Sequence, residues 1–320
     1  MEKICWDADK AIKMLNTFGT TRFDRDREPK KARVEVYKNN LEVYRQWGYV
    51  TDSGKEIALP DKQQTLDTTK VYSAPFSVEG VPARYDKTDF VVEQVGCLEA
   101  GRRMMADGLN PAILNFADAY EACGMYNTGS NAQEESICRV STLPPTLYQY
   151  YNKRWANKAS VPMREVPGYP MDKNFGGIYS KVTVFREGPS GGFRFSETPY
   201  DTAVISVACL RFTRRDLDDN GVDQNHSDIE YQAGDGSWTP EGEEIMRNKV
   251  RTIYRIAIEN GHDSIVLGAW GCGVFKQNPD KIARLFTNVL DEPEFKGKFK
   301  ELFFAVPGEK NYYPFANALR

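Results

Sequence analysis

Apolar residues along the chain follow two patterns, and the change between them falls near residue 75. Before it, residues 30–48 place apolar side chains from Val34 to Trp47 at mixed spacings of three and four and stop at a glycine, which predicts an amphipathic helix. Residues 52–70 are polar and turn-rich, so we treat them as a connection. We therefore expect an N-terminal helical extension, residues 1–75, packed on a main domain, residues 76–320.

From residue 87 onward, short apolar runs alternate with helical patterns, which is typical of a layered α/β domain with helices on both sheet faces. Several runs are continuous in Val, Ile, Leu and Phe, as expected for strands covered on both faces of a largely parallel or mixed sheet. The expected strands are residues 90–95, 112–116, 179–185, 203–208, 265–269 and 302–306.

Two helices carry explicit boundary signals. Thr239 can cap a helix whose first position is Pro240, and Gly261 ends it. The run Asn278-Pro279-Asp280 predicts a second helix start in the same way.

A first candidate site lies in residues 114–143. A buried strand ends in Asn115-Phe116-Ala117, a loop with Gly124 and Gly129 follows, and Gln133-Glu134-Glu135 then opens a helix. Ligands of α/β sheets gather beyond the carboxyl ends of strands, so we expect this loop and the two glutamates to face a crevice.

Adjacent glutamates on a helix point roughly 100° apart, so we do not expect them to share one position in a site. One could act as general acid and base while the other holds a hydroxyl group of the substrate. Acidic residues at a helix start also simply complement the helix dipole, and spacing alone favours that plainer interpretation.

A second candidate site lies in residues 264–286, where an apolar strand leads into a loop with Gly268, Gly271 and Gly273 and then a capped helix. Consecutive backbone amides beside a helix terminus can bind a diphosphate without lysine. A tight turn explains a lone Gly-x-Gly equally well, and the loop lacks the signatures of nucleoside-triphosphate and dinucleotide sites.

Together these segments resemble the microbial-type poly(ADP-ribose) glycohydrolases, which are macrodomains with three α/β/α layers. The resemblance rests on Asn115-Phe116-Ala117, on Gln133-Glu134-Glu135 and on the Gly-Ala-Trp-Gly-Cys-Gly-Val-Phe run at residues 268–275. Residues 178–186 and the early helix are also similar to the family. The resemblance implies a three-layer α/β/α macrodomain with a mixed sheet.

The resemblance also implies an activity, the release of ADP-ribose from poly(ADP-ribose) or a modified acceptor. Glu135 would protonate the leaving oxygen and then activate water, while Glu134 would position the ribose. Gln133 and Asn115 would orient the carboxylates or bind ribose hydroxyls. The amides of Gly271, Cys272, Gly273 and Val274 would wrap the diphosphate, and Phe275 would pack against the ligand. Neither a metal nor another cofactor is implied.

One motif departs from the family, because Ala122-Cys123-Gly124 stands where the family has three glycines. Two added β-carbons restrict the backbone near the distal ribose, so we expect activity to be reduced or redirected to another linkage. The alternative function is therefore a macrodomain that binds ADP-ribose or a related nucleotide without cleaving it. A third hypothesis, an unrelated hydrolase with Cys123 as nucleophile, ranks below a space-filling role for this thiol.

Composition narrows these alternatives. The 320 residues carry a net charge of −3, so we expect no nonspecific nucleic-acid binding. No run of eighteen apolar residues predicts a membrane span, and the charged residues 1–10 do not resemble a secretory signal. Six scattered cysteines suit a reducing compartment, so we expect a cytoplasmic protein. We also expect it to be a monomer.

Metal and triad chemistry have little material in this chain. With only His226 and His262, a histidine zinc site or a Ser-His-Asp triad is not expected, and both are interpreted as surface or packing residues. Asp216, Asp218, Asn220 and Gly221 imitate the start of a calcium loop, but Ser227 stands where a bidentate glutamate is required.

Overall fold

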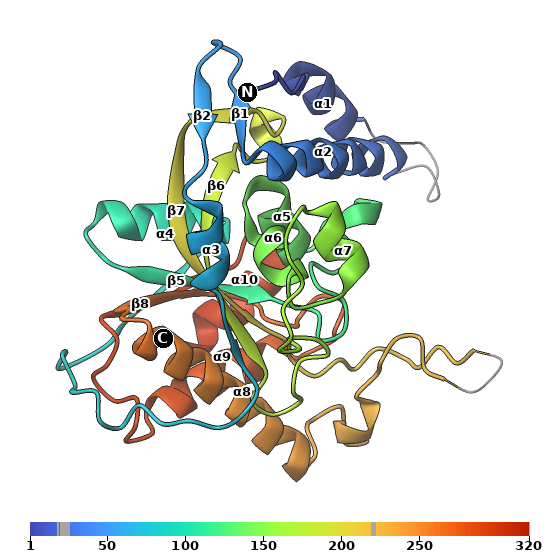
Figure 1. The fold of residues 1–320 in the computed structure, drawn as a ribbon. Helices are drawn as coiled ribbons and strands as arrows, with labels where there is room; N and C mark the ends of the chain where they lie inside the picture. The colour runs from blue at the N-terminus through green and yellow to red at the C-terminus, as the bar shows by residue number, and fades with distance from the viewer. Residues whose placement is uncertain (18, 20–25, 219–221, 320) are drawn as a thin grey trace. The chain divides into compact units, whose positions relative to one another are not determined.

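The structure, a computed structural model, describes residues 1–17, 19, 26–218 and 222–319 (Figure 1). Its helices are α1 (Ala8–Leu15), α2 (Arg27–Gln46), α3 (Lys62–Asp67), α4 (Cys97–Ala106), α5 (Gln133–Val140), α6 (Leu143–Tyr148), α7 (Lys153–Lys158), α8 (Pro240–Glu259), α9 (Pro279–Leu290) and α10 (Glu309–Ala318), with short 3₁₀ turns η1 (Tyr126–Thr128), η2 (Pro189–Gly191) and η3 (Ile229–Tyr231). Its strands are β1 (Gly48–Val50), β2 (Glu56–Ala58), β3 (Lys70–Tyr72), β4 (Asp89–Glu93), β5 (Pro111–Phe116), β6 (Gly177–Arg186), β7 (Phe195–Val207), β8 (Ser264–Leu267) and β9 (Glu301–Ala305).

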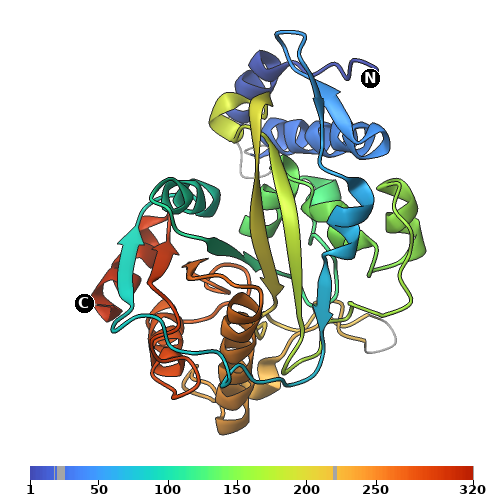
Figure 2. The same ribbon diagram turned by 60° about the vertical axis from the view of Figure 1, so that its left-hand side comes forward.

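The main sheet has the strand order β3-β6-β7-β5-β8-β9-β4. β5 pairs in parallel with both β7 and β8, and β9 pairs in parallel with β8 and β4. β6 and β7 run in opposite directions as a long ribbon (Figure 2), so the sheet is mixed, as expected. Strands β1 and β2 form a separate antiparallel pair.

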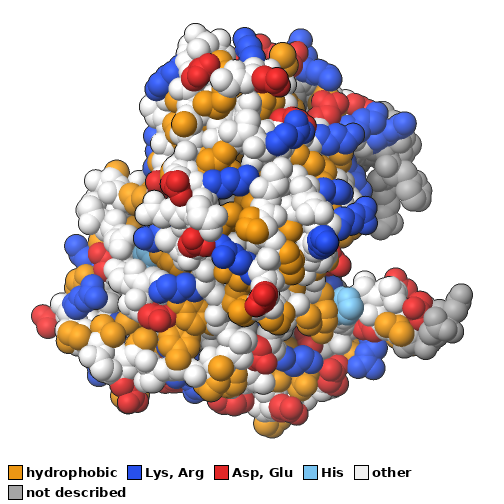
Figure 3. All heavy atoms as spheres, in the orientation of Figure 1, with side chains coloured by type: hydrophobic (Ala, Val, Ile, Leu, Met, Phe, Trp, Pro, Cys, Tyr) orange, Lys and Arg blue, Asp and Glu red, His pale blue; other side chains and the backbone are white. Residues whose placement is uncertain are grey.

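The chain divides into two compact units, each made of separate segments. Unit 1 comprises Met1–Lys70, Glu121–Pro170 and Ser180–Thr202, and unit 2 comprises Val71–Tyr120, Met171–Tyr179 and Ala203–Arg320. The division expected at residue 75 stays a prediction. On the face seen in Figure 3, basic and acidic side chains are interspersed, in keeping with the small net charge.

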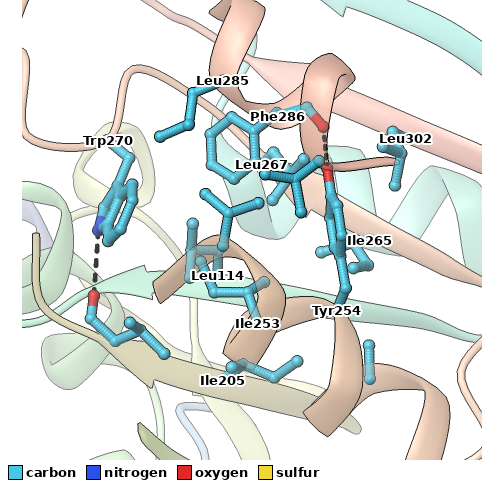
Figure 4. Close-up of a cluster of buried hydrophobic side chains, with 14 of the residues drawn as sticks. Leu114, Ile205, Ile253, Tyr254, Ile265, Leu267, Trp270, Leu285, Phe286 and Leu302 are labelled. Carbon is cyan, nitrogen blue, oxygen red and sulfur yellow. Dashed lines mark hydrogen bonds between the residues drawn. The ribbon is translucent and has the colours of Figure 1, made fainter. Parts of the chain in front are cut away.

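Unit 2 buries its main core between one face of the sheet and helices α8 and α9 (Figure 4). Alternate strand residues supply it, because side chains i and i+2 share a sheet face. Two polar groups within this core are satisfied: the Tyr254 hydroxyl donates to the Phe286 carbonyl at 2.9 Å, and Trp270 Nε1 donates to the Val207 carbonyl at 3.0 Å. The labelled core residues are Leu114, Ile205, Ile253, Tyr254, Ile265, Leu267, Trp270, Leu285, Phe286 and Leu302.

Helix α4 covers the opposite face of the same sheet. A β-carbon on Gly101 would lie 2.9 Å from the side chain of Ile113, which points away from the core face that Leu114 joins. Helices on both faces of the sheet give unit 2 the expected three layers, and the predicted α/β/α fold is confirmed.

The boundary signals of the helices are confirmed in detail. The Thr239 hydroxyl accepts a hydrogen bond from the Gly242 amide, and the Asn278 side chain accepts one from the Lys281 amide. The predicted helix within residues 30–48 is α2, which ends at Gln46 with Trp47 in the left-handed conformation. All six expected strands are present within a few residues at most boundaries.

Two segments differ from expectation. Residues 52–70 are not a plain connection, because they contain β2, α3 and the start of β3. Strand β7 begins at Phe195, eight residues before the expected start at Ala203. Its first half, FSETPYDT, is largely exposed or half-buried, so it lacks the apolar run by which its second half is recognised. No helix in the described part of the chain is long and apolar enough to cross a membrane.

Candidate active site

The two glutamates of the first candidate site are buried at the start of α5 in unit 1. Glu134 is 3% exposed and Glu135 is 5% exposed. Acidic residues that only complement a helix dipole stay in water, where their charge costs nothing to keep. Burial of two neighbouring carboxyl groups therefore favours a role in binding or chemistry over the plainer interpretation.

Gly124 contacts both carboxylates. A β-carbon at this position would lie 2.8 Å from Glu135 Oε1 and 3.2 Å from Glu134 Oε2. The expectation that adjacent glutamates do not share one position is therefore wrong for their carboxylates. The backbone directions of the two residues diverge, but their long side chains bend toward the same turn.

The Glu135 carboxylate is anchored at one oxygen only. The Met125 amide donates a hydrogen bond to Glu135 Oε1 at 3.0 Å, whereas Oε2 is buried and accepts no hydrogen bond from the described residues. A carboxylate held through one oxygen keeps its second oxygen available for proton transfer to or from a bound group.

The replaced glycines of the family motif are accommodated differently. Cys123 takes the left-handed conformation at φ 67°, and its side chain is fully buried beside Cys138 and Tyr148. Ala122 is also buried, at 4% exposure, and is not among the left-handed residues. The side chain of Cys123 thus enters the interior of unit 1, and Gly124 lies against the carboxylates.

Cys123 is poorly suited to act as a nucleophile. Burial raises the pKa of its thiol, and the Glu134 carboxylate raises it further, although contact with Cys138 acts in the opposite direction. The thiolate is the reactive form, and burial, the largest effect on this thiol, opposes its formation. These features favour the space-filling interpretation of Cys123 over the hypothesis of a cysteine hydrolase.

Helix α5 also carries a buried arginine that sequence reasoning missed. Arg139 lies one turn after Glu135 and is fully buried, and its Nε and Nη2 make no hydrogen bond to a described residue. Burial lowers its pKa to about 10, and the Glu135 carboxylate opposes that shift. The sequence did contain a signal for Arg139: it follows Glu135 by four residues, and residues four apart lie on the same face of a helix.

Helix α2 forms hydrogen bonds with the loop that precedes α5 in the candidate site. Asn40 Nδ2 donates to the hydroxyl of Tyr126 and to the carbonyl of Arg139, each at 2.8 Å. Arg33 Nε donates to the Gly129 carbonyl at 2.6 Å. The N-terminal helix thus fixes both the η1 turn and the end of α5, a contribution that its amphipathic pattern did not reveal.

In unit 2, Asn115 lies near the end of β5 and is fully buried, with Nδ2 donating to Ser206 Oγ at 3.0 Å. Three residues later, the Asp118 carboxylate pairs with the Arg211 guanidinium. Arg211 also donates to the Asn225 carbonyl and lies 4.2 Å from the ring centre of Phe275. Both charged residues follow the carboxyl ends of buried strands, which is the signal that could have identified them.

The glycine-rich loop of unit 2 follows β8, and its backbone packs so closely against neighbouring residues that a side chain at Gly271 would not fit. Gly271 is left-handed at φ 73°, and a β-carbon there would overlap Cys209 Sγ. The turn is closed by the Gln277 amide, which donates to the Gly271 carbonyl at 3.0 Å, while Gln277 Nε2 donates to the Leu210 carbonyl at 2.6 Å.

The free amides of this loop are typical of an anion-binding site. Those of Gly273, Val274 and Phe275 are consecutive and donate to no described residue, and Val274 is 65% exposed. The Cys272 amide is already used, because it donates to the Ala269 carbonyl at 3.1 Å. A row of unused amides is the arrangement that binds phosphate oxygens, with Cys272 outside the donor set.

The histidines and acidic residues indicate no metal site. His262 is buried between the Tyr179 hydroxyl and the Asn110 carbonyl, and His226 stacks on Tyr120 with ring centres 3.9 Å apart. No group of three potential ligands that could hold a metal ion lies within the described ranges. Of the calcium-like run, Asn220 and Gly221 lie outside the described residues.

Comparison with known proteins connects this chain to one family. Residues 38–187 match the family model "Microbial-type PARG, catalytic domain". This region contains the Asn-Phe-Ala strand end, the Ala-Cys-Gly turn and the Gln-Glu-Glu helix start. No curated protein matches the chain.

Solved structures of the same kind resemble the whole fold. Poly(ADP-ribose) glycohydrolase from Thermomonospora curvata has a TM-score of 0.66 at 27% identity, over 90% of this chain and 99% of that one. The same enzyme bound to the inhibitor ADP-HPD gives 0.65 at 26% identity over the same shares. Poly(ADP-ribose) glycohydrolase from Deinococcus radiodurans in complex with ADP-ribose gives 0.58 at 25% identity, over 82% of this chain and 97% of that one.

Proposed function

We propose that this protein releases ADP-ribose from poly(ADP-ribose) or from an ADP-ribosylated acceptor, because residues 38–187 match the family model of the microbial-type poly(ADP-ribose) glycohydrolase catalytic domain. It is then a hydrolase that cleaves a glycosidic bond. The observation that supports this most directly is the pair of buried carboxylates over Gly124, with Glu135 anchored at one oxygen.

In this proposal Glu135 is the general acid and base. Its Oε2 delivers a proton to the leaving oxygen as the glycosidic bond breaks, and the resulting carboxylate then removes a proton from the attacking water. The Met125 amide holds Oε1 throughout, so the carboxyl group keeps its orientation between the two steps. Glu134 and Gln133 position the ribose that carries the scissile bond.

In this proposal the glycine-rich loop of unit 2 binds a diphosphate. The unused amides of Gly273 and Val274 neutralise phosphate oxygens, and the amide of Gly271 contributes from the left-handed turn. Phe275, held by Arg211, packs against the ligand. Asn115 orients neighbouring polar groups from the end of β5. None of these steps calls on a metal or another cofactor.

Replacing Glu135 with Gln tests this mechanism. We expect E135Q to lower the rate of ADP-ribose release by at least about 1,000-fold, because the amide cannot exchange a proton with the leaving oxygen or with water. Binding of ADP-ribose, measured by calorimetry, should change by less than a few-fold. The matched control is E165Q, which removes an exposed carboxylate of the same unit.

Full turnover by E135Q would refute the role of Glu135. Calorimetric binding of ADP-ribose by the wild-type protein, without release from polymer, protein or nucleic-acid conjugates over long incubation, would instead identify a binding module. The altered glycine motif was the reason to consider that alternative, and the burial of Cys123 away from Gly124 weakens it.

The setting is a further part of the proposal. All six cysteines are free, which suits a reducing compartment, and we propose that the protein acts in the cytoplasm. We also propose that it acts as a monomer.

A further inference from the structure

A basic groove runs along α2, outside the catalytic residues proposed above. It encloses about 580 Å³ and is lined by Asp26, Arg27, Lys30, Lys31, Val34, Glu35, Lys38 and Thr128. Seven of these residues come from α2 and its N-cap, and Thr128 ends the η1 turn. Figure 3 shows basic side chains gathered over α2. The lining holds four cations and two carboxylates, whereas the chain as a whole has a net charge of −3.

Both carboxylates of the groove are already paired with cations that do not line it. Asp26 accepts two hydrogen bonds from Arg33 Nη2 at 2.8 Å, and Glu35 lies 3.5 Å from Lys10 Nζ. Arg33 and Lys10 thus cancel the negative charge of the groove from outside it. The lining therefore keeps the positive potential of its own cations.

Three of the four cations that line the groove form no ion pair with a described carboxylate. Lys31 pairs with Glu28 at 2.6 Å, whereas Arg27, Lys30 and Lys38 make no ion pair with a described residue. All three are exposed. They are placed to bind an anion from solution at little desolvation cost.

The spacing of the cations matches an extended anion. Positions 27, 30, 31 and 38 fall on one helix face, since they are separated by three, four, seven and eleven residues. From Arg27 to Lys38 the helix rises about 16 Å. A single phosphate occupies only a fraction of that length, so the groove suits a chain that carries several phosphates.

The groove is also continuous with the loop that holds Glu135. The Met125 amide binds the Glu135 carboxylate, and Thr128, three residues later, lines the groove. A 3₁₀ turn rises about 2 Å per residue, so the two positions are roughly 6 Å apart along the turn. The Arg33 bond to the Gly129 carbonyl fixes α2 to the end of this turn.

We propose that this basic groove binds the diphosphate groups of ADP-ribose units that neighbour the one being released. The proposal rests on the proposed glycohydrolase function and makes the enzyme favour long polymer over short substrates. Polymer is favoured over nucleic acid as the occupant, because the groove begins at the catalytic loop and the remaining chain has no positive excess.

The test is the double variant K30Q/K38Q, compared with K153Q/K181Q, which removes two exposed lysines of the same unit outside the groove. KM and kcat are measured on long polymer and on a two-unit ADP-ribose fragment, at low salt and at about 0.15 M salt. We expect K30Q/K38Q to raise the KM for long polymer about 10-fold without changing kcat. The fragment should be unaffected, and the salt slope of polymer binding should fall by about 0.7 per lysine.

An equal rise in KM on both substrates, or no difference from K153Q/K181Q, would overturn the proposal. So would single-stranded nucleic acid without ADP-ribose that binds as tightly as polymer and depends on the same lysines. Binding of fluorescent polymer is also measured with the lysine substitutions introduced into the E135Q protein, which is expected not to cleave the polymer. If the wild-type protein releases nothing, the proposed function fails, while this affinity difference still decides whether the groove binds polymer.

Discussion

The neighbouring residues Cys123 and Gly124 both have a left-handed backbone conformation, but only Cys123 has room for a side chain. Both have positive φ, at 67° and 52°. The Cys123 side chain fits in the interior of unit 1, and the strain of a left-handed non-glycine residue, about 1 kcal/mol, is the cost of that fit. At Gly124 the space is already filled by the Glu135 and Glu134 carboxylates.

Replacing Gly124 with Ala should therefore disable the enzyme. The new β-carbon would lie 2.8 Å from Glu135 Oε1, so the carboxylate must move, and a shift of about 1 Å costs on the order of 100-fold in rate. We expect kcat to fall by that factor or more in G124A, measured as ADP-ribose release. C123G serves as the control and should keep kcat within a few-fold of wild type. Equal losses in the two variants would show that the turn as a whole, and not the Gly124 contact, matters.

Helix α8 carries one buried charged residue whose burial lowers the stability of the fold. Its inner face packs into the unit 2 core, yet Lys249 on this helix is only 3% exposed. Burial lowers the pKa of Lys249 to about 8, although Cys209, Asp228 and Asp172 act to raise it and Lys173 to lower it. An ammonium group whose pKa is lowered by folding destabilises the folded state at any pH where it stays protonated.

This gives a pH dependence with a definite sign. Below pH 8 Lys249 is protonated in both states and the full penalty applies, at most about 3 kcal/mol. Between pH 8 and its unfolded value of 10.5 the unfolded chain binds more protons, so the free energy of unfolding rises with pH.

We expect K249M to be more stable than wild type at pH 7 and to lack that rise, as measured by urea unfolding from pH 7 to 10. K310M, at an exposed lysine of α10, should follow the wild-type curve. A K249M protein that is less stable than wild type at pH 7 would contradict the prediction and indicate that the ammonium group has a favourable partner.

The N-terminal segment is part of unit 1 and not an appendage to it. Met1–Lys70 forms that unit together with residues 121–170 and 180–202. Asn40 donates to the Arg139 carbonyl and Tyr44 to the Ser141 carbonyl, so α2 satisfies buried acceptors at the end of α5. These acceptors would lose their partners without the segment.

A chain that begins at residue 76 should therefore lose the active-site geometry even though it keeps Glu135. We expect a lower unfolding temperature and loss of ADP-ribose release, and the addition of residues 1–75 as a separate polypeptide should restore part of both. A truncated chain that unfolds at the wild-type temperature and cleaves polymer would show that residues 76–320 are an independent domain.

Local sequence signals were enough to place most elements and to identify the residues that are candidates for chemistry. The starts of α8 and α9 follow from Thr239 and Asn278, because a cap bonds to an amide three residues away. The apolar second half of β7 was recognised for a similarly local reason, whereas its polar first half was missed. Gln133-Glu134-Glu135 marked the start of α5 correctly.

The contacts among the candidate residues could be known only from the folded chain. It brought Glu134 and Glu135 to the same glycine, separated the tolerated Cys123 from the constrained Gly124, and buried Arg139 and Lys249. These outcomes depend on contacts between segments distant in sequence, such as α2 with α5, and on the low polarity of the interior. Periodicity and caps report the local preference of the backbone, and they carry no information about which distant group will fill a given space.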